Sequence, residues 1–348
     1  MVRIEFNRRL QSLLGIAAFV VIVAGMKAAA PLLVLFLLAA FIAVVTLPLF
    51  AGLQRRGIPA PIALLILVLL LILIAAGATT VLAGSVADFT ANLDIYQERL
   101  QHRMSGLLEQ AAERGFKLSD FIAEQLDTGA LWRAMGDALA GISGLFGQLF
   151  IVLIVVIFLL LEAAILPKKI RAIQGISDDT RQRLADAVDS VRRYMGVKTL
   201  MSLLTGSLVA ILLAGTRTDY PILLGFTAFL LNFVPNIGSF VASVPGILLA
   251  FVEFGPGRAA IVAVGYVIIN VGVSNFIEPP TLGRSLGLSP LVVILSLLFW
   301  GWVLGPVGMV LSVPLTMTVK IFMGSLEETR GLALLLSASA PEEQGGTE

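Results

Sequence analysis

The sequence contains no cysteine and only one histidine, His102, among its 348 residues. Disulfide bonds, thiolate metal sites and histidine-based metal clusters are therefore excluded. Walker A and HExxH motifs are also absent, so we predict that the protein is not an enzyme and has no cofactor. Charged residues make up 14% of the chain and the net charge is +1, which argues against nucleic acid as a partner.

Apolar residues, in contrast, make up 58% of the chain and give it a mean hydropathy of +0.97. A soluble domain does not need that much apolar surface, so we predict an all-α polytopic membrane protein with the lipid bilayer as its solvent. Basic residues precede the first apolar run, as in a signal peptide. No small-residue cleavage site follows, and we interpret this run as a retained first span.

Six apolar stretches are predicted to form full transmembrane helices. They lie near residues 10–27, 31–50, 62–86, 144–166, 197–214 and 259–276. With the segments between them, they divide the chain into five parts. These are N-terminal transmembrane helices (1–87), an extramembrane amphipathic helical segment (88–141), a transmembrane helix with a basic surface helix (142–196), a core with two broken segments (197–326) and a polar C-terminal tail (327–348).

Two of the segments between these spans are predicted to be amphipathic helices. Apolar residues recur every three or four positions from Phe89 to Ala111, and a second helical piece follows near 118–139. We expect a small domain that packs on itself or on a neighbouring subunit; the alternative is a solvated connector. The basic stretch after Ser177 is expected to lie on the membrane surface and to lead into the span at Val197.

Two further apolar segments are interrupted at their centres by proline and glycine. The first runs from Pro221 to Phe251 with its break at 235–238, and the second from Pro290 to Ile321 with its break at 305–308. Each arm has about 15 residues, or about 23 Å of helix, which is short for a hydrocarbon core of about 30 Å. We predict two oppositely oriented re-entrant hairpins, an inverted repeat typical of secondary transporters.

The basic residues predict the orientation in the membrane. Most of the 24 lysines and arginines fall on the face that also carries both termini, and positive charge marks the cytoplasmic side. Both termini are therefore expected in the cytoplasm. If the hairpin arms are full spans instead, the chain crosses ten times, and the orientation of the termini does not change.

The two breaks are candidate binding sites, because non-helical backbone inside a membrane must line a cavity or be buried in protein. The N–H and C=O groups freed at these tips can bind a polar solute or a cation. The candidate residues are Asn232, Pro235, Asn236, Gly238 and Ser239 at the first tip and Gly305, Pro306 and Gly308 at the second. The alternative is that proline and glycine only permit tight turns and that the asparagines cap helix ends.

A second polar cluster lies at the end of the last full span. At α-helical spacing, Asn270 with Ser274 and Asn275 with Glu278 each lie near one helix face. A carboxylate beside a membrane span is costly and is therefore a functional candidate. Glu278 could bind a proton or Na⁺ and couple its gradient to transport. In the alternative interpretation it lies at the interface and pairs with Arg284.

The motifs around these residues resemble those of the autoinducer-2 exporter family, also called AI-2E family transporters. They are a Pro-x-Ile-Gly turn (235–238), Glu-Pro-x-x-x-Gly (278–283), Leu-Gly-Leu-Ser-Pro (286–290), Gly-x-x-Gly-Met (305–309) and a final proline at 314. The likeness is specific over about 180–322, whereas the N-terminal half agrees in layout only. Pro280 stands where the family usually has a basic residue, which puts any local ion pair from that position in doubt.

This resemblance implies export of small molecules across the bacterial inner membrane, driven by an ion gradient rather than by ATP. Autoinducer-2, a small polar furanone-type signal, is the substrate that names the family, and other members are assigned to Na⁺(Li⁺)/H⁺ exchange. It also implies a cyclic homo-oligomer, for which a pentamer is one option, with a mobile transport domain moving against a scaffold. Our leading hypothesis is a secondary transporter for a small polar solute; the alternatives are a cation/proton antiporter and a membrane scaffold or interaction protein.

Overall fold

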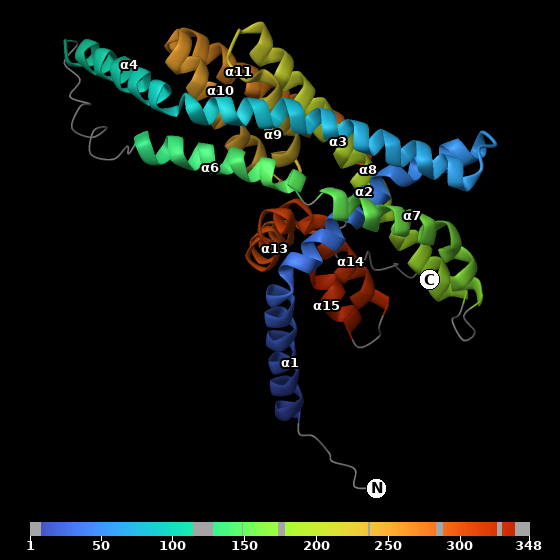
Figure 1. Ribbon diagram of the computed structural model, residues 1–348. Coiled ribbons are helices and arrows are strands. Elements are labelled where there is room, and N and C mark those ends of the chain that lie inside the picture. The colour runs from blue at the N-terminus through green and yellow to red at the C-terminus, as the bar shows by residue number, and fades with distance from the viewer. Residues whose placement is uncertain are drawn as a thin grey trace, which may run out of the picture.

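The computed structural model describes residues 8–113, 128–147, 149–172, 178–235, 237–282, 288–325 and 329–337 (Figure 1). In these ranges the secondary structure is almost entirely α-helical, with one π-helix and one isolated bridge between Leu288 and Ser337. Six helices in this part of the chain are long and apolar enough to cross a membrane. The prediction of an all-α polytopic membrane fold is therefore confirmed.

The six helices that could span a membrane differ in part from the six predicted spans. They are Ala30–Arg55 (α2), Ala60–Ala91 (α3), Val188–Gly215 within α8, Ile237–Phe254 (α10), Pro256–Thr281, which begins with α11, and Pro290–Val310 (α13). The predicted first and fourth spans correspond to α1 (Arg8–Ala28) and α7 (Leu149–Ala172), whose apolar stretches are shorter. By length alone, α10 and α13 could cross the membrane, so length does not distinguish a re-entrant hairpin from a pair of full spans.

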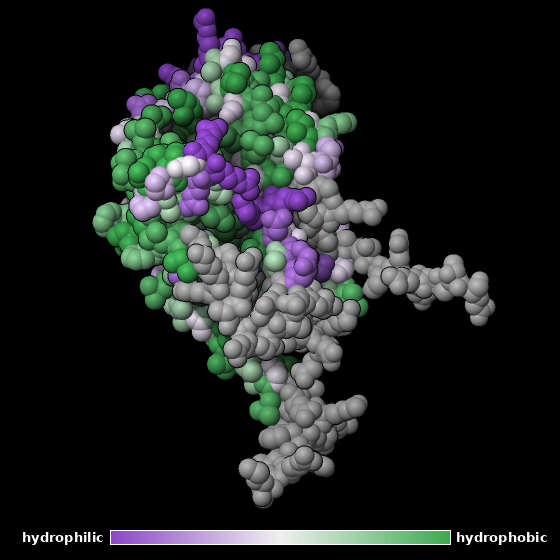
Figure 2. All heavy atoms as spheres, turned by 90° about the vertical axis from the view of Figure 1, so that its right-hand side faces the viewer, coloured by the Kyte–Doolittle hydropathy of each residue, from purple (hydrophilic) through white to green (hydrophobic). Residues whose placement is uncertain are grey.

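The N-terminal part is a layer built from α2, α3 and α7. Small side chains make the close packing possible, since Ala39, Ala43 and Ala63 are buried where these helices meet Val156 of α7. In Figure 1, α3 runs from the right-hand end of the molecule toward its left-hand part, and α1 projects away from the rest. Figure 2 shows a band of hydrophilic side chains on the face at the right-hand end of Figure 1, between largely hydrophobic surfaces.

The second part is built around α8 (Asp178–Gly215), α9 (Pro221–Leu231), α10 and α11 (Pro256–Val271). Two glycines bring α8 and α9 together: a Cβ on Gly206 would lie 2.6 Å from the carbonyl oxygen of Gly225. The first hairpin consists of α9, the turn that begins at residues 232–235, and α10. The second consists of α13, which turns at Gly305, and α14 (Ser312–Ser325).

One helix, α8, replaces two predicted elements. The sequence predicted a separate basic surface helix that ends before a span at Val197, but the structure has one α-helix of 38 residues from Asp178 to Gly215. Its length is about 57 Å at 1.5 Å per residue. No proline interrupts this range, and Gly196 alone does not end the helix.

The segment predicted to form an extramembrane domain packs on its own chain. Helix α3 continues to Ala91 before α4 (Leu93–Glu113) begins, and α6 covers Thr128–Gly147. Tyr96 of α4 and Trp132 of α6 lie in the same buried cluster as Leu249 of α10. The predicted polar tail also contains a short packed helix, α15 (Arg330–Leu335), with Ala333 buried. Both segments thus contribute to the fold described here.

A hydrogen-bonded network fixes the base of the first hairpin. The Tyr96 hydroxyl donates to Asp219 Oδ2 at 2.8 Å, and the Tyr220 hydroxyl donates to Asp88 Oδ2 at 2.7 Å. Burial raises the pKa of the Tyr96 phenol well above its usual value, so this donor stays protonated at physiological pH. The network joins the end of α3, the start of α4 and the loop before α9, which holds the hairpin base in place.

Candidate functional site

A stripe of polar side chains runs along the buried face of α8. Tyr194, Lys198, Ser202 and Thr205 are spaced four, four and three residues apart, so they share one side of the helix. All four are buried. Buried polar groups are normally hydrogen-bonded, yet the Thr205 hydroxyl has no partner among the described residues. This stripe organises the candidate site.

Lys198 forms a buried ion pair with Glu278. Its Nζ lies 2.8 Å from Glu278 Oε1, and the two side chains are 8% and 14% exposed. Glu278 directly follows the π-helix Gly272–Ile277 and starts α12 (Glu278–Leu282). Single π-helical turns are rare and are frequent at functional sites. The alternative partner considered for Glu278, Arg284, lies outside the described residues, and the carboxylate is held by Lys198.

The first tip reaches the same stripe through Asn232. Its side chain is 3% exposed, and its Nδ2 donates to Ser202 Oγ at 3.0 Å. The next residue, Phe233, packs edge-on against Phe41 of α2, with ring centroids 5.4 Å apart. Ser202 lies one helical turn from Lys198, about 6 Å along the axis of α8. The first tip and Glu278 therefore contact the same face of α8, about one helical turn apart. Their roles in transport stay predictions.

Close contact between the two arms explains the glycine in each tip. A Cβ on Gly238 would overlap the carbonyl oxygen of Leu231, and a Cβ on Gly308 would overlap that of Trp300. Pro235 and Ser239 are half-buried beside the first tip, whereas Asn236 lies outside the described residues. The two broken segments thus share a tight turn in which a glycine lets the two arms come close together.

The second tip differs from the first in its polarity. Gly305 has φ 69° and ψ −153°, which breaks the helix before Pro306. Trp300 Nε1 of α13 donates to Thr316 Oγ1 of α14 at 2.9 Å, so this polar contact joins the two arms away from the turn itself. Val307 belongs to an apolar cluster with Tyr194, and Pro306 is exposed. Among the described residues, polar side chains from this tip do not enter the Lys198–Glu278 site.

The structure changes the helix on which Asn270 with Ser274 and Asn275 with Glu278 were predicted to share a face. The prediction assumed a regular α-helix, but residues 272–277 are π-helical and have a different period. Ser274 and Asn275 are exposed, and Asn270 is half-buried. Only Glu278 of this group joins the buried site.

Lys198 is the functional candidate that the sequence reading missed. Because Lys198 follows a basic stretch, the sequence alone groups it with the basic residues of the expected cytoplasmic face. The available signal was its position between Tyr194 and Ser202, four residues from each, at the start of an apolar run. In the part of the chain that the structure describes, no group of three or more acidic or histidine side chains could hold a metal ion. The charges of the site are thus those of one lysine and one glutamate.

Interrupted apolar helices around a buried, oppositely charged pair define a class, the membrane transport proteins. The chain belongs to the AI-2E family: the sequence profile described as AI-2E family transporter matches residues 16–328. The family assignment made from the motifs is therefore confirmed.

Relatives with transport names cover almost the whole chain. A putative transport protein of Haemophilus influenzae is 39% identical over 333 residues, which span 94% of this chain and 96% of the relative. The AI-2 transport protein TqsA of Escherichia coli is 36% identical over 332 residues, with 94% and 96% covered. The putative transport protein YhhT of Escherichia coli is 33% identical over 333 residues, with 95% of each chain covered.

Proposed function

We propose that this protein is a secondary transporter that exports a small polar signal or metabolite, driven by a gradient of H⁺ or Na⁺. The observation that carries the proposal is the buried Lys198–Glu278 pair, one helical turn from the contact between Ser202 and Asn232. The name of the relative TqsA makes autoinducer-2 the first substrate to test.

The coupling step follows from the charges of the pair. A proton or Na⁺ that binds the Glu278 carboxylate neutralises its negative charge. The electrostatic attraction between this carboxylate and the Lys198 ammonium then weakens, and with it the contact between α8 and the segment after the π-helix. Ser202 lies on the same face of α8, where Asn232 binds it. Ion binding at Glu278 would therefore change the packing at the first tip, where Asn232 would hold the solute; Asn236 stays a candidate from the sequence.

The second candidate function is a Na⁺(Li⁺)/H⁺ antiporter, in which Glu278 binds the transported cation itself. Its support is the same carboxylate, which is buried and has a charged partner that a cation must displace. The third hypothesis, an interaction protein acting through residues 88–141, has less support. The apolar face of that segment, which includes Tyr96 and Trp132, is buried in one cluster with residues of the protein's own α3 and α10.

The setting of the transporter belongs to the proposal. We place it in the bacterial inner membrane with both termini in the cytoplasm, and with the two hairpins re-entrant from opposite sides. We also propose a cyclic homo-oligomer, for which a pentamer is one option; the exposed apolar side chains of α1, such as Phe19 and Val21, would face lipid or a neighbouring subunit. Residues 1–87 would then be the scaffold and 197–326 the transport core.

Flux in proteoliposomes tests the function. Labelled autoinducer-2 and internal pH are followed together after a pH or Na⁺ gradient is imposed, for the wild type, Glu278→Gln and the control Asp189→Asn. We expect solute flux that follows the gradient, falls at least tenfold in Glu278→Gln and is unchanged in Asp189→Asn, since Asp189 is exposed on the same helix. Cation-for-proton exchange without solute would favour the antiporter. Normal gradient-driven flux in Glu278→Gln would disprove the coupling role.

A further inference from the structure

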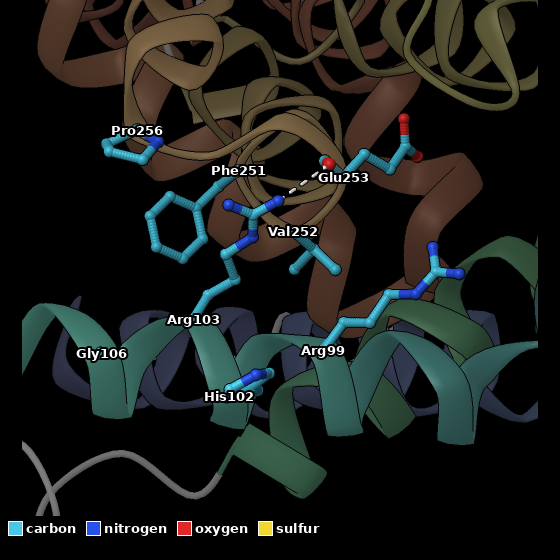
Figure 3. Close-up of a pocket in the computed structure, with 8 residues that line it drawn as sticks. All are labelled: Arg99, His102, Arg103, Gly106, Phe251, Val252, Glu253 and Pro256. Atoms are coloured by element: carbon cyan, nitrogen blue, oxygen red, sulfur yellow. Dashed lines mark hydrogen bonds between the residues drawn. The ribbon is translucent and has the colours of Figure 1, made fainter.

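A separate cavity of about 680 Å³ lies between α4 and the end of α10, far along α10 from the first tip (Figure 3). Its volume falls in the range of small-molecule sites. Helix α4 supplies three basic side chains to its wall, Arg99, His102 and Arg103. The opposite wall is formed by the last turn of α10, including Val252 and Glu253. The cavity plays no part in the transport site proposed above.

Two arginines reach from α4 toward α10 in Figure 3. Arg103 Nη2 donates to the carbonyl oxygen of Glu253 at 3.2 Å, which directs this guanidinium group toward the end of α10. Arg99 is four residues away on the same face of α4 and interacts electrostatically with Glu253. Among the described residues, Arg99 makes no direct hydrogen bond or ion-pair contact. The donors of both guanidinium groups are thus largely available.

The carboxylate of Glu253 does not close this site. Both of its oxygens accept weakly from the backbone N–H of Asp219, at 3.4 and 3.3 Å. Figure 3 shows this carboxylate pointing away from Arg103, which meets only the main chain of Glu253. The cavity therefore has two guanidinium groups on one side, and the carboxylate in its lining is turned away from Arg103 and lies on the side of Arg99, with which it interacts electrostatically.

We propose that this cavity binds a phosphate group between Arg99 and Arg103. Guanidinium groups present paired N–H donors that match the oxygens of a phosphate, and charge-assisted bonds of this kind are strong. The cavity is larger than a phosphate ion needs, which leaves room for the group esterified to it. It also lies at the end of the apolar stretch Ile237–Phe254, where the headgroup of a surrounding lipid would come within reach. The source is either free phosphate or the headgroup of an anionic lipid.

Occupancy of the cavity would stiffen the molecule. A phosphate held by α4 and lying against the end of α10 would cross-link the 88–141 segment to the returning arm of the first hairpin. Ligands that bind only the folded state raise its stability by mass action. Binding therefore has a readout that does not depend on transport.

The test measures thermal unfolding of the full-length protein in detergent with increasing inorganic phosphate at constant ionic strength, and in nanodiscs of phosphatidylglycerol or phosphatidylcholine. The variants are Arg99→Gln, Arg99→Gln/Arg103→Gln and the control Arg193→Gln, an arginine exposed on α8. We expect phosphate or phosphatidylglycerol to raise the Tm of the wild type and of Arg193→Gln by several degrees, and the double variant to lose at least half of this shift.

Arg99→Gln leaves the hydrogen bond from Arg103 to Glu253 intact. A weaker response to phosphate in this variant therefore reports loss of binding and not loss of folding. Phosphate affinity from calorimetric titration should fall at least fivefold in this variant. A shift produced by inorganic phosphate identifies the free anion as a ligand, and a shift restricted to phosphatidylglycerol identifies the lipid headgroup. Equal shifts in the wild type and the double variant, or no shift with either probe, would overturn the proposal.

Discussion

Helix α8 carries two ion pairs that use the same chemistry in opposite settings. Lys198 and Glu278 are 2.8 Å apart, with side chains 8% and 14% exposed, and they join segments eighty positions apart in the sequence. Arg193 and Asp189 are 3.9 Å apart, one turn from each other on α8, with side chains 66% and 63% exposed. Exposed pairs contribute about 0–1 kcal/mol, whereas removing one partner of a buried pair costs about 3–5 kcal/mol. The comparison shows that burial, and not charge alone, decides how much an ion pair of α8 contributes to stability.

The largest effect is expected for Lys198→Met. The substitution leaves the Glu278 carboxylate buried without its partner, and we expect the free energy of unfolding to fall by about 3–5 kcal/mol. Denaturant or thermal unfolding in detergent measures this loss. The double variant Lys198→Met/Glu278→Gln should recover most of the stability but not the flux. If Lys198→Met unfolds like the wild type, the pair is not a buried interaction in the membrane protein.

Substitution by alanine tests whether glycine is required at the tips because the two arms leave no room for a Cβ. In Gly308→Ala the new Cβ overlaps the carbonyl oxygen of Trp300, and overpacking of this kind costs about 1–3 kcal/mol. Gly324→Ala is the matched control on the same hairpin, because its Cβ would meet only Ala333 Cβ at 3.7 Å. Thermal unfolding should separate the two variants, and equal stability would refute the close approach of the arms.

A smaller effect is expected at the polar contact of the first tip. Ser202→Ala removes the acceptor for Asn232 Nδ2, and a hydrogen bond of this type contributes about 1 kcal/mol. A double-mutant cycle with Asn232→Ala isolates the pairwise coupling in unfolding experiments. The same variants report on transport, because Asn232 belongs to the proposed solute site. Strict additivity of the two substitutions would contradict a direct contact.

The smallest effect is expected for the exposed pair. Asp189→Asn and Arg193→Gln should each change the free energy of unfolding by less than about 0.5 kcal/mol, with no dependence of flux on either residue. Added salt should abolish even that difference, because exposed charges are screened. A loss as large as that of Lys198→Met would show that this stretch of α8 is buried against another subunit.

The fold class and the tight tips could be predicted because they depend on local sequence. Apolar runs predict helices, and proline with glycine predicts the turns at 235–238 and 305–308. The partner of Glu278 could not be predicted in this way, since Lys198 is eighty positions away and only the packing of α8 brings the two together. The π-helix was also missed, because spacing arguments assume the α-helical period. The roles of Asn232 and Glu278 in transport stay predictions.

The π-helix before Glu278 has a mechanical consequence. The π-helix Gly272–Ile277 has more residues per turn than the α-helices on either side. The helix that follows it is therefore rotated about its axis relative to a continuous α-helix. Each residue of an α-helix turns about 100° around the axis. If the wide turn tightened by one residue, everything after it would swing by about that angle, and Glu278 would leave Lys198 without any helix having to unfold. The extra residue in this turn thus sets the direction in which Glu278 points toward Lys198.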